Sequence, residues 1–268
     1  MKLEDKRIVL TGAGGGIGAH VARLLAEKGA RLALLDRSEA ALEETAGMLR
    51  EAVYEPLIVP VDLLDTQSRG TALEQAISHL GGVDILINNA GLMSFRPFHQ
   101  EDPEVINRIV QLNTLVPMQL TRQLLPRMLD QGLGRIVNVG STFGSIAFAW
   151  FAAYSTSKFG LRGFSEALRR ELADTGVGVT YVAPRAVKTK LNSSAIYRMA
   201  EAVKMNMDEP DWVAARIVEA IRKGRNDVYL GFPESLFVRI NGLLPRLVDG
   251  AMKKQNHKMM EFAKEGAS

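Results

Sequence analysis

The sequence predicts a single α/β domain built on a doubly wound parallel β-sheet with helices on both faces. Six short apolar segments alternate with stretches whose apolar residues recur at helical spacing. Strands that are apolar almost throughout are typical of a sheet covered by helices on both sides. The connecting stretches are long enough for helices, which favours right-handed crossovers between parallel strands. A length of 268 residues, 47% of them hydrophobic, suits one domain of this kind.

The first two strand–helix units begin with short apolar runs. Residues Arg7–Leu10 (RIVL) are predicted to form a strand, followed by a helix over Ile17–Lys28 that ends at Gly29. The next strand is predicted at Arg31–Leu35, and the helix after it begins near Ser38. The strands therefore follow one another at the spacing that βαβ units require.

Four further apolar runs continue this pattern. They predict strands at Leu57–Val61, Val83–Asn88, Arg135–Val139 and Val177–Val182. No linker, low-complexity tract or longer repeat interrupts the alternation, so residues 1–268 are predicted to form one domain.

Composition and charge narrow the function classes. The net charge is only +3 and no basic stripe is concentrated in the chain, so a nucleic-acid partner is not expected. The chain has no cysteine, which excludes disulfides and thiolate chemistry. The N-terminus lacks the apolar core of a signal peptide and no run is long enough to span a membrane, so we expect a cytoplasmic protein. No metal is predicted, because the histidines are scattered: His20, His79, His99 and His257.

A glycine-rich turn, TGAGGGIG at Thr11–Gly18, follows the first predicted strand and opens the first helix. Glycine lets the backbone approach a ligand closely, and a helix N-terminus attracts a pyrophosphate. The alternative is a tight strand–helix turn without a ligand. No Gly-Lys-Ser/Thr follows, which argues against an NTPase phosphate loop. The predicted cofactor contacts here are Gly12, Gly14, Gly16, Ile17 and Gly18.

Asp36 ends the second predicted strand, about 20 residues beyond the glycines, where a carboxylate can accept both ribose hydroxyls of an adenosine. It would repel a 2′-phosphate, which favours NAD over NADP. The adjacent Arg37, also a predicted cofactor contact, leaves NADP as the less favoured choice. The alternative is that Asp36 only caps the helix that starts near Ser38.

Tyr154 and Lys158 stand four residues apart on one predicted helical face, thirteen residues after Ser141. Reduction of a ketone by a hydride leaves an alkoxide that needs a proton, and oxidation of an alcohol needs a base. A tyrosine serves both directions if its pKa falls from about 10 toward neutrality, and the charge of Lys158 favours the phenolate. Ser141 can hydrogen-bond the substrate oxygen. The alternatives are a surface Tyr–Lys pair and a serine that caps a strand end.

Several motifs together resemble the classical short-chain dehydrogenase/reductase family. They are TGAGGGIG, NNAG at Asn88–Gly91, Asn113, Ser141 and YSTSK, and the resemblance covers residues 6–230. It implies a Rossmann-like fold, NAD(P)-dependent oxidoreductase activity on CH–OH groups, and a homodimer or homotetramer formed through the helices near Asp102–Leu129 and Ala152–Thr175. It also gives Asn113 a water-holding role in a proton relay to Lys158, the alternative being a helix-kinking Asn. Further implied cofactor contacts are Asp62, Leu63, Asn89, Ala90, Gly91, Pro184, Val187 and Thr189.

Arg185 departs from the family pattern, because it follows Pro184 where the family has Pro-Gly. It would either contact an anionic substrate group or point to solvent, as a loop arginine usually does. Residues 188–210 resemble the family's mobile substrate lid, where methionines suit a hydrophobic substrate. Plain helix packing is the alternative.

Apolar residues surround the predicted catalytic group. Met93, Phe143 and Phe148, together with Ser141 and Tyr154, are predicted to form a pocket for a lipophilic alcohol or ketone. Core or subunit contacts are the alternative for some of them.

The C-terminal extension, residues 232–268, carries apolar residues at helical spacing, interrupted by Pro245 and flanked by Arg239, Arg246, Lys253 and Lys254. A packed lid or subunit-interface helix is the favoured interpretation. A peripheral contact with an anionic membrane is the alternative, because basic residues beside an apolar stripe suit such a surface.

The favoured function is an NAD(H)-dependent oxidoreductase that interconverts a secondary alcohol and a ketone, with Tyr154 as general acid/base. One alternative is an NADPH-dependent 3-oxoacyl-thioester or carbonyl reductase. Another is a non-catalytic dinucleotide-binding sensor, although a sensor needs no acid/base pair.

Overall fold

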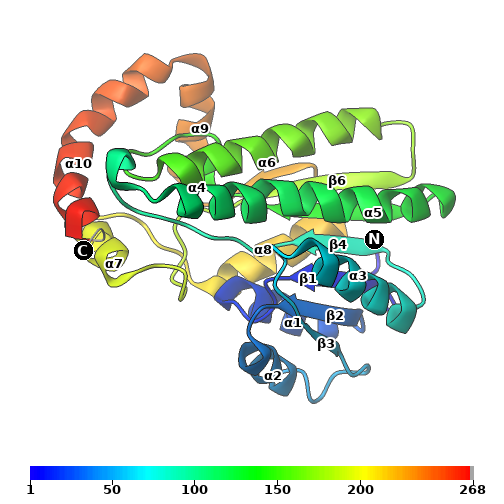
Figure 1. Cartoon of the computed structure of the whole chain (residues 1–268). Helices are drawn as coiled ribbons and strands as arrows, with labels where there is room; N and C mark the ends of the chain where they lie inside the picture. The colour runs from blue at the N-terminus through cyan, green and yellow to red at the C-terminus, as the bar shows by residue number, and fades with distance from the viewer. Residues whose placement is uncertain (266–268) are drawn as a thin grey trace.

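The predicted doubly wound sheet is confirmed in a computed structural model, which describes residues 1–265. Within these residues a seven-stranded parallel sheet has the order β3-β2-β1-β4-β5-β6-β7. Helices lie on both of its faces (Figure 1). The strands are β1 (Arg7–Thr11), β2 (Arg31–Asp36), β3 (Leu57–Pro60), β4 (Ile85–Asn88), β5 (Gly134–Val139), β6 (Val177–Ala183) and β7 (Asp227–Tyr229).

The six strands predicted from apolar runs are all present, and β7 is the one that sequence reasoning missed. It has three residues, DVY, and they are exposed or half-buried. It pairs with β6, where Val182 lies opposite Val228. Such a short run has no recognisable period, so only the neighbouring strand identifies it.

The helices fall between the strands as expected. Ser38 is the N-cap of the second helix, where its side chain accepts a hydrogen bond from the Ala41 N–H at 3.3 Å. The helices are α1 (Gly16–Ala26), α2 (Glu39–Gly47), α3 (Thr66–Leu80), α4 (Pro103–Val110), α5 (Val116–Asp130), α6 (Ala152–Glu171), α7 (Ser194–Ala202), α8 (Pro210–Lys223), α9 (Glu234–Leu243) and α10 (Pro245–Glu265).

The single helix predicted near Asp102–Leu129 is divided into α4 and α5 by a π-helical turn at Gln111–Leu115. The turn inserts one extra residue per hydrogen-bonded ring, which changes the face on which the following side chains lie. π turns are frequent at functional sites. Here the turn contains Asn113, which is completely buried.

Alternate residues of the central strands pack into two cores, one on each face of the sheet. Ile8 and Leu10 belong to the core under α1 and α8, whereas Val9 between them belongs to the core under α3 and α5. All three side chains are fully buried. Each such side chain contributes roughly 2 kcal/mol of transfer free energy, so the apolar runs specify both layers.

The strand order reverses at β1, which lies between β2 and β4. In open parallel sheets, ligands bind at the carboxyl ends of the strands where the order reverses. Asp36 ends β2, and Asn88 ends β4, at this same edge. The loops that leave β1, β4, β5 and β6 therefore converge on one place.

The C-terminal extension forms an arch outside the sheet. α9 and α10 run away from the body and return to it beside α7 (Figure 1). The predicted interruption is confirmed, because α9 ends at Leu243 and α10 begins at Pro245. Residues 266–268 of the predicted extension lie outside the described residues. Of the helices in the described part of the chain, none has the length and hydropathy needed to cross a bilayer.

Candidate active site

A cavity of about 410 Å³ lies at the carboxyl ends of the strands. Its lining runs from Asp36 at one end to Tyr154 and Lys158 at the other. Nearly all of the site residues predicted from the sequence line it. Within the described residues, the predicted ones that do not contribute to the lining are Gly14, Gly18, Asn113 and Phe148.

The glycine turn leaves no room for side chains. A Cβ on Gly12, whose φ is +67°, would lie 2.8 Å from the Cα of Ala90. A Cβ on Gly18 would lie 2.0 Å from the carbonyl oxygen of Gly12. Gly18 therefore closes the turn and does not line the cavity, and its role as a cofactor contact stays a prediction. A Cβ on Gly16 would come within 3.0 Å of the Thr189 side chain, so this glycine keeps open the passage between the turn and the segment after β6.

The Asp36 carboxylate is held in place by two backbone donors. Its Oδ2 accepts a hydrogen bond from the Gly14 N–H and its Oδ1 accepts one from the Ser38 N–H, both at 3.1 Å. Gly14 thus acts through Asp36 and not at the cavity wall. The N-cap of α2 is Ser38 and not Asp36, so the capping alternative for Asp36 is wrong. A fixed carboxylate at the end of β2, beside a glycine turn at a helix N-terminus, fits the adenosine end of a dinucleotide.

The NNAG segment is joined directly to the glycine turn. The Thr11 hydroxyl accepts hydrogen bonds from the Asn89 N–H at 3.1 Å and the Ala90 N–H at 3.2 Å. The Asn89 side chain donates to the Gly12 carbonyl at 3.0 Å. These bonds fix the loop after β4 against the loop after β1, so the two loops that form the cavity floor are held in a fixed arrangement.

Ser141, Tyr154 and Lys158 meet at the other end of the cavity. All three are buried. The Lys158 ammonium donates to the Val139 carbonyl at 3.0 Å and lies 5.7 Å from the centre of the Tyr154 ring. The interpretation of Tyr154 and Lys158 as a surface pair is therefore wrong.

Burial is the main cause of the pKa shifts of Tyr154 and Lys158. Loss of hydration raises the pKa of Tyr154 to about 12, although the Ser141 side chain acts in the opposite direction. Burial lowers the pKa of Lys158 to about 8. Both shifts arise because a charged group is costly to place in an apolar surrounding. The pKa of the phenol thus lies above its ordinary value, in the direction opposite to the one expected from the nearby lysine alone.

Asn113 anchors the loop after β4 to α6. Its Oδ1 accepts from the Leu92 N–H at 2.8 Å, and its Nδ2 donates to the Leu92 carbonyl at 2.8 Å and to the Ser157 hydroxyl at 2.9 Å. With these three bonds the side chain is a positioning group, and it lies behind the cavity wall. The water-holding role implied by the family resemblance stays a prediction.

Tyr181 is a functional residue that the sequence analysis did not identify. Its hydroxyl donates to the Ser141 carbonyl at 3.2 Å and accepts from the Ser141 N–H at 3.4 Å. A Cβ on Gly140 would lie 2.2 Å from its ring, so this glycine makes room for it. A signal was present, because a tyrosine in a fully buried strand needs a partner for its hydroxyl.

The wall near Tyr154 is aromatic and apolar. The Phe143 ring meets the Tyr154 ring edge-on, with centres 6.0 Å apart. Phe148 stacks on Phe143 at 4.3 Å and is not part of the cavity lining, and its role in the substrate pocket stays a prediction. The apolar residues that line this end are Met93, Phe143, Phe151, Ile196, Met199 and Met205.

Arg185 fits neither of the two predicted alternatives. It borders the cavity, but its guanidinium binds the carboxylates of Asp208 and Glu234 at 2.7 Å and 2.9 Å. Its side chain is only 17% exposed, so it does not point to solvent. The guanidinium is occupied by protein carboxylates and is not directed at an anionic substrate group.

Comparisons with known proteins agree with this geometry. The family model described as short chain dehydrogenase matches residues 6–199. The chain is 34% identical over 226 residues to a protein named ketoacyl reductase HetN from Nostoc sp., with 84% of this chain and 78% of that protein covered. It is 32% identical over 253 residues to dehydrogenase/reductase SDR family member 7B from Bos taurus, which covers 90% of this chain and 78% of the relative.

A solved structure provides a further comparison. A short chain dehydrogenase/reductase from Burkholderia phymatum in complex with NAD superposes with a TM-score of 0.83 at 25% identity, over 92% of this chain and 96% of the other. The fold, the buried serine–tyrosine–lysine group and the family match lead to one conclusion. This chain belongs to the short-chain dehydrogenase/reductase family of oxidoreductases.

Proposed function

We propose that the protein is an NAD(H)-dependent oxidoreductase that interconverts a secondary alcohol and a ketone of a lipophilic substrate. The observation that carries this proposal is the position of Ser141, Tyr154 and Lys158 at one end of a cavity whose other end is formed by Asp36 and the glycine turn. One cavity would thereby hold both the proton-transfer group and the dinucleotide. A non-catalytic sensor would not need a buried phenol and ammonium beside each other.

NAD would supply the hydride or accept it. The glycine turn, Asp36 and Asp62 would hold its adenosine and phosphates, and the loop Asn89–Gly91 would lie beside its nicotinamide half. Lys158 would reach the ribose on that side. The Asp36 carboxylate argues for NAD, since it would repel the 2′-phosphate of NADP.

Tyr154 carries the proton transfer in the proposed mechanism. Ser141 hydrogen-bonds the substrate oxygen, and the Tyr154 hydroxyl gives its proton to that oxygen during reduction or takes it during oxidation. With a pKa of about 12 the phenol is fully protonated at neutral pH, as reduction requires. With a pKa of about 8, Lys158 is still mainly charged at pH 7, and its charge favours the phenolate needed for oxidation.

The apolar wall defines the proposed substrate class. Phe143, Phe151 and Met199 line the end of the cavity next to Tyr154. A substrate whose reacting carbon lies at Tyr154 would place its remaining chain against these residues. Burying a longer apolar chain is favourable, whereas a polar chain would lose its hydration without gaining partners.

We expect kcat/KM to rise with the apolar length of a ketone or secondary alcohol, by roughly fourfold per buried CH2, because each contributes about 0.8 kcal/mol. A panel of graded length, followed by NADH absorbance with NAD(H) and NADP(H) in parallel, measures this. Equal turnover of short polar and long apolar substrates would contradict the substrate class. A strong preference for NADP would contradict the cofactor assignment.

A second candidate is reduction of a 3-oxoacyl thioester with NADPH. It is supported by the Nostoc relative, whose name is ketoacyl reductase, and by Arg37, which lines the cavity next to Asp36. The same panel separates the two proposals if it includes a 3-oxoacyl thioester. Preference for that substrate with NADPH would replace the first proposal.

A homodimer or homotetramer in the cytoplasm is proposed as the working form. The supporting observation is that α5 and α6 expose apolar side chains on their outer faces. Met118 and Leu129 on α5 and Phe159 on α6 are each about two-fifths exposed. Pairing these helices with those of a second copy would bury them.

The arch of α9 and α10 has a surface that also suits an anionic membrane. Arg239, Arg246 and Lys253 are exposed beside a concentration of exposed apolar residues. Basic residues next to an apolar face favour contact with anionic lipid. The exposed apolar residues are Phe232, Leu236, Phe237, Leu243, Leu244 and Leu247.

We therefore expect the protein to co-sediment with vesicles that contain anionic lipid and to be released by added salt. Leu243→Ser combined with Leu247→Ser should abolish co-sedimentation and leave turnover of a soluble substrate unchanged. The matched control is Leu133→Ser, which replaces an exposed leucine that does not belong to α9 or α10. No binding of the intact protein to vesicles would exclude a membrane contact and leave the packed-helix interpretation.

A further inference from the structure

The segment after β6 forms a loop that is closed at its neck by main-chain hydrogen bonds. The Asp208 N–H donates to the Ala186 carbonyl at 2.8 Å, and the Lys188 N–H donates to the Asp208 carbonyl at 3.0 Å. We call the residues between these points, 189–207, the lid loop. It contains α7 and the cavity-lining Ile196, Met199 and Met205.

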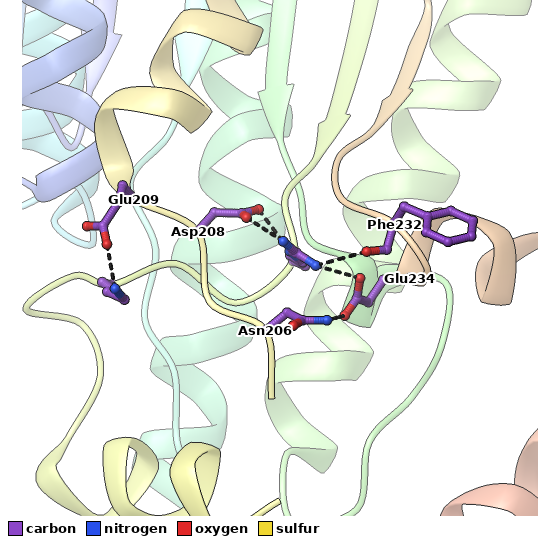
Figure 2. Close-up of polar contacts among 7 residues, drawn as sticks. Asn206, Asp208, Glu209, Phe232 and Glu234 are labelled. Atoms are coloured by element: carbon purple, nitrogen blue, oxygen red, sulfur yellow. Dashed lines mark hydrogen bonds and ion pairs between the residues drawn. The ribbon is translucent and has the colours of Figure 1, made fainter. Parts of the chain in front are cut away.

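Arg185 stands on the entry side of this neck and binds Asp208 on its exit side and Glu234 of the C-terminal extension. Its Nε and Nη2 donate to the two carboxylate oxygens of Asp208, at 3.0 Å and 2.7 Å. Its Nη1 donates to the Glu234 carboxylate at 2.9 Å and to the Phe232 carbonyl at 3.2 Å. The other oxygen of Glu234 accepts from the Asn206 side chain at 3.1 Å. Figure 2 shows Asp208, Asn206 and Glu234 converging at this point.

The chain makes room for this arrangement. Gly231 has a φ of +86°, and a Cβ placed on it would lie 2.6 Å from the Cδ of Arg185. The Asp208 and Glu234 side chains are only 10% and 25% exposed. An arginine fork that binds a carboxylate with two hydrogen bonds in partial burial fixes geometry more firmly than a mobile surface pair. The cluster is therefore a defined structural element.

Arg185 is also connected to the catalytic group through its neighbour Pro184. The carbonyl of Pro184 accepts a hydrogen bond from the Thr142 N–H at 2.8 Å, and Thr142 follows Ser141 directly. A displacement of the neck would thus be transmitted to the backbone next to Ser141 and to the cavity-lining Val187 and Thr189.

The far end of the lid loop is held by the C-terminal extension. Met259 and Ala263 of α10 are fully buried in one apolar cluster with Ile196 and Met199 of α7, and the cluster includes Tyr154. The extension begins at the Glu234 end, where α9 starts, and returns at α10. It therefore contacts the lid loop twice, first at the neck through Arg185 and then at α7.

We propose that Arg185 is a positioning residue that keeps the neck of the lid loop closed and attaches the C-terminal extension to it, so that α7 and α10 stay in place as the wall beside Tyr154. The kinetic part of this inference rests on the proposed function. The structural part does not, because the opening of the neck is measurable without turnover.

The test compares Arg185→Gly, which restores the family's Pro-Gly, with the intact protein. Limited trypsin digestion should cut faster after Lys190, Arg198 and Lys204 of the lid loop, because local opening exposes these sites. Displacement of the pocket wall should lower kcat/KM for the lipophilic substrate by roughly ten- to a hundredfold, mainly through KM. The pH profile of kcat should not move, since the variant changes neither Tyr154 nor Lys158 nor the bond from Lys158 to the Val139 carbonyl.

The chain offers a matched control at the same neck. Lys188 and Glu209 form an ion pair whose side chains are 51% and 58% exposed (Figure 2). Surface pairs of this kind contribute little, so Glu209→Gln should leave trypsin cleavage and KM unchanged. Arg185→Lys keeps the charge but lacks the fork, so its behaviour should fall between Arg185→Gly and the intact protein.

Equal trypsin cleavage and equal KM in Arg185→Gly and Glu209→Gln would overturn the inference. If Arg185→Gly does not fold, Asp208→Asn provides the same comparison, because it weakens the fork while keeping the size of the side chain. If the intact protein reduces no ketone with either dinucleotide, the proposed function fails. The trypsin comparison still decides whether Arg185 closes the neck.

Discussion

Tyr154→Phe is expected to reduce kcat by about 10²–10⁴-fold, the range that general acid–base catalysis contributes. The change removes only the hydroxyl. The phenyl ring keeps its edge-on contact with Phe143, so the pocket wall is preserved. Dinucleotide affinity, measured by NADH fluorescence, should stay the same. A fully active Tyr154→Phe protein would exclude Tyr154 as the acid/base.

Tyr181→Phe is the matched control for this experiment. Tyr181 is a second buried tyrosine next to Ser141, and its hydroxyl hydrogen-bonds to the Ser141 main chain. Its loss should displace Ser141 and produce a smaller decrease in kcat, with an unchanged dependence of kcat on pH. If both variants lose activity to the same extent, the effect of Tyr154→Phe cannot be assigned to proton transfer.

The fold could be predicted from local pattern because its strands are buried on both faces. A central strand such as RIVL must be apolar at its buried positions Ile8–Leu10, since Ile8 and Val9 enter different cores. The seventh strand carries no such signal, as DVY lies at the sheet edge and is not fully buried. Its position depends on pairing with β6, which is a long-range contact.

The residues of the candidate site also differ in how well the sequence predicts their positions. Residues that are predicted to meet the ligand, such as Asp36 and Tyr154, stand in recognisable motifs and line the cavity. Gly18 and Phe148 stand in equally suggestive places but face the turn and the Phe143 ring. Their direction depends on local backbone geometry, which residue type alone does not fix.

Arg185 shows why distant partners limit prediction. Its carboxylate partners lie 23 and 49 residues away in the chain, on the exit of the lid loop and at the start of α9. No periodicity joins these positions. From the sequence it resembles an ordinary loop arginine, and only the meeting of three chain segments at one edge of the sheet gives it partners.

Lys158→Met is expected to inactivate the enzyme and at the same time make the folded protein more stable. Burial lowers the pKa of Lys158 from 10.5 to about 8. A depression of this size corresponds to about 3 kcal/mol of folding free energy lost to holding a buried charge. Methionine fills a similar volume without a charge. It leaves the Val139 carbonyl without its donor, which costs about 1 kcal/mol.

The gain in stability should depend on pH in a defined direction. Below pH 8 the lysine is charged in both the folded and unfolded states, and the full cost of burying the charge is present. As pH rises from 8 to 10.5, the folded protein releases this proton before the unfolded chain does, and the cost disappears. At pH 7 the free energy of unfolding of the variant should therefore be about 2 kcal/mol larger than that of the intact protein, and its Tm should be higher by about 5 °C. This difference should disappear near pH 10.5.

Urea or thermal unfolding at pH 7 and pH 10 measures the difference, and Lys158→Arg supplies the comparison. Arginine keeps the charge at every accessible pH and should be no more stable than the intact protein. A Lys158→Met protein that is less stable than the intact protein at pH 7 would show that the bond to Val139 outweighs the burial of the ammonium. Lys158 would then be a residue that stabilises the folded state. The expected result instead supports a functional role for the lysine, because a charge that the folded state holds at a cost is typical of functional sites.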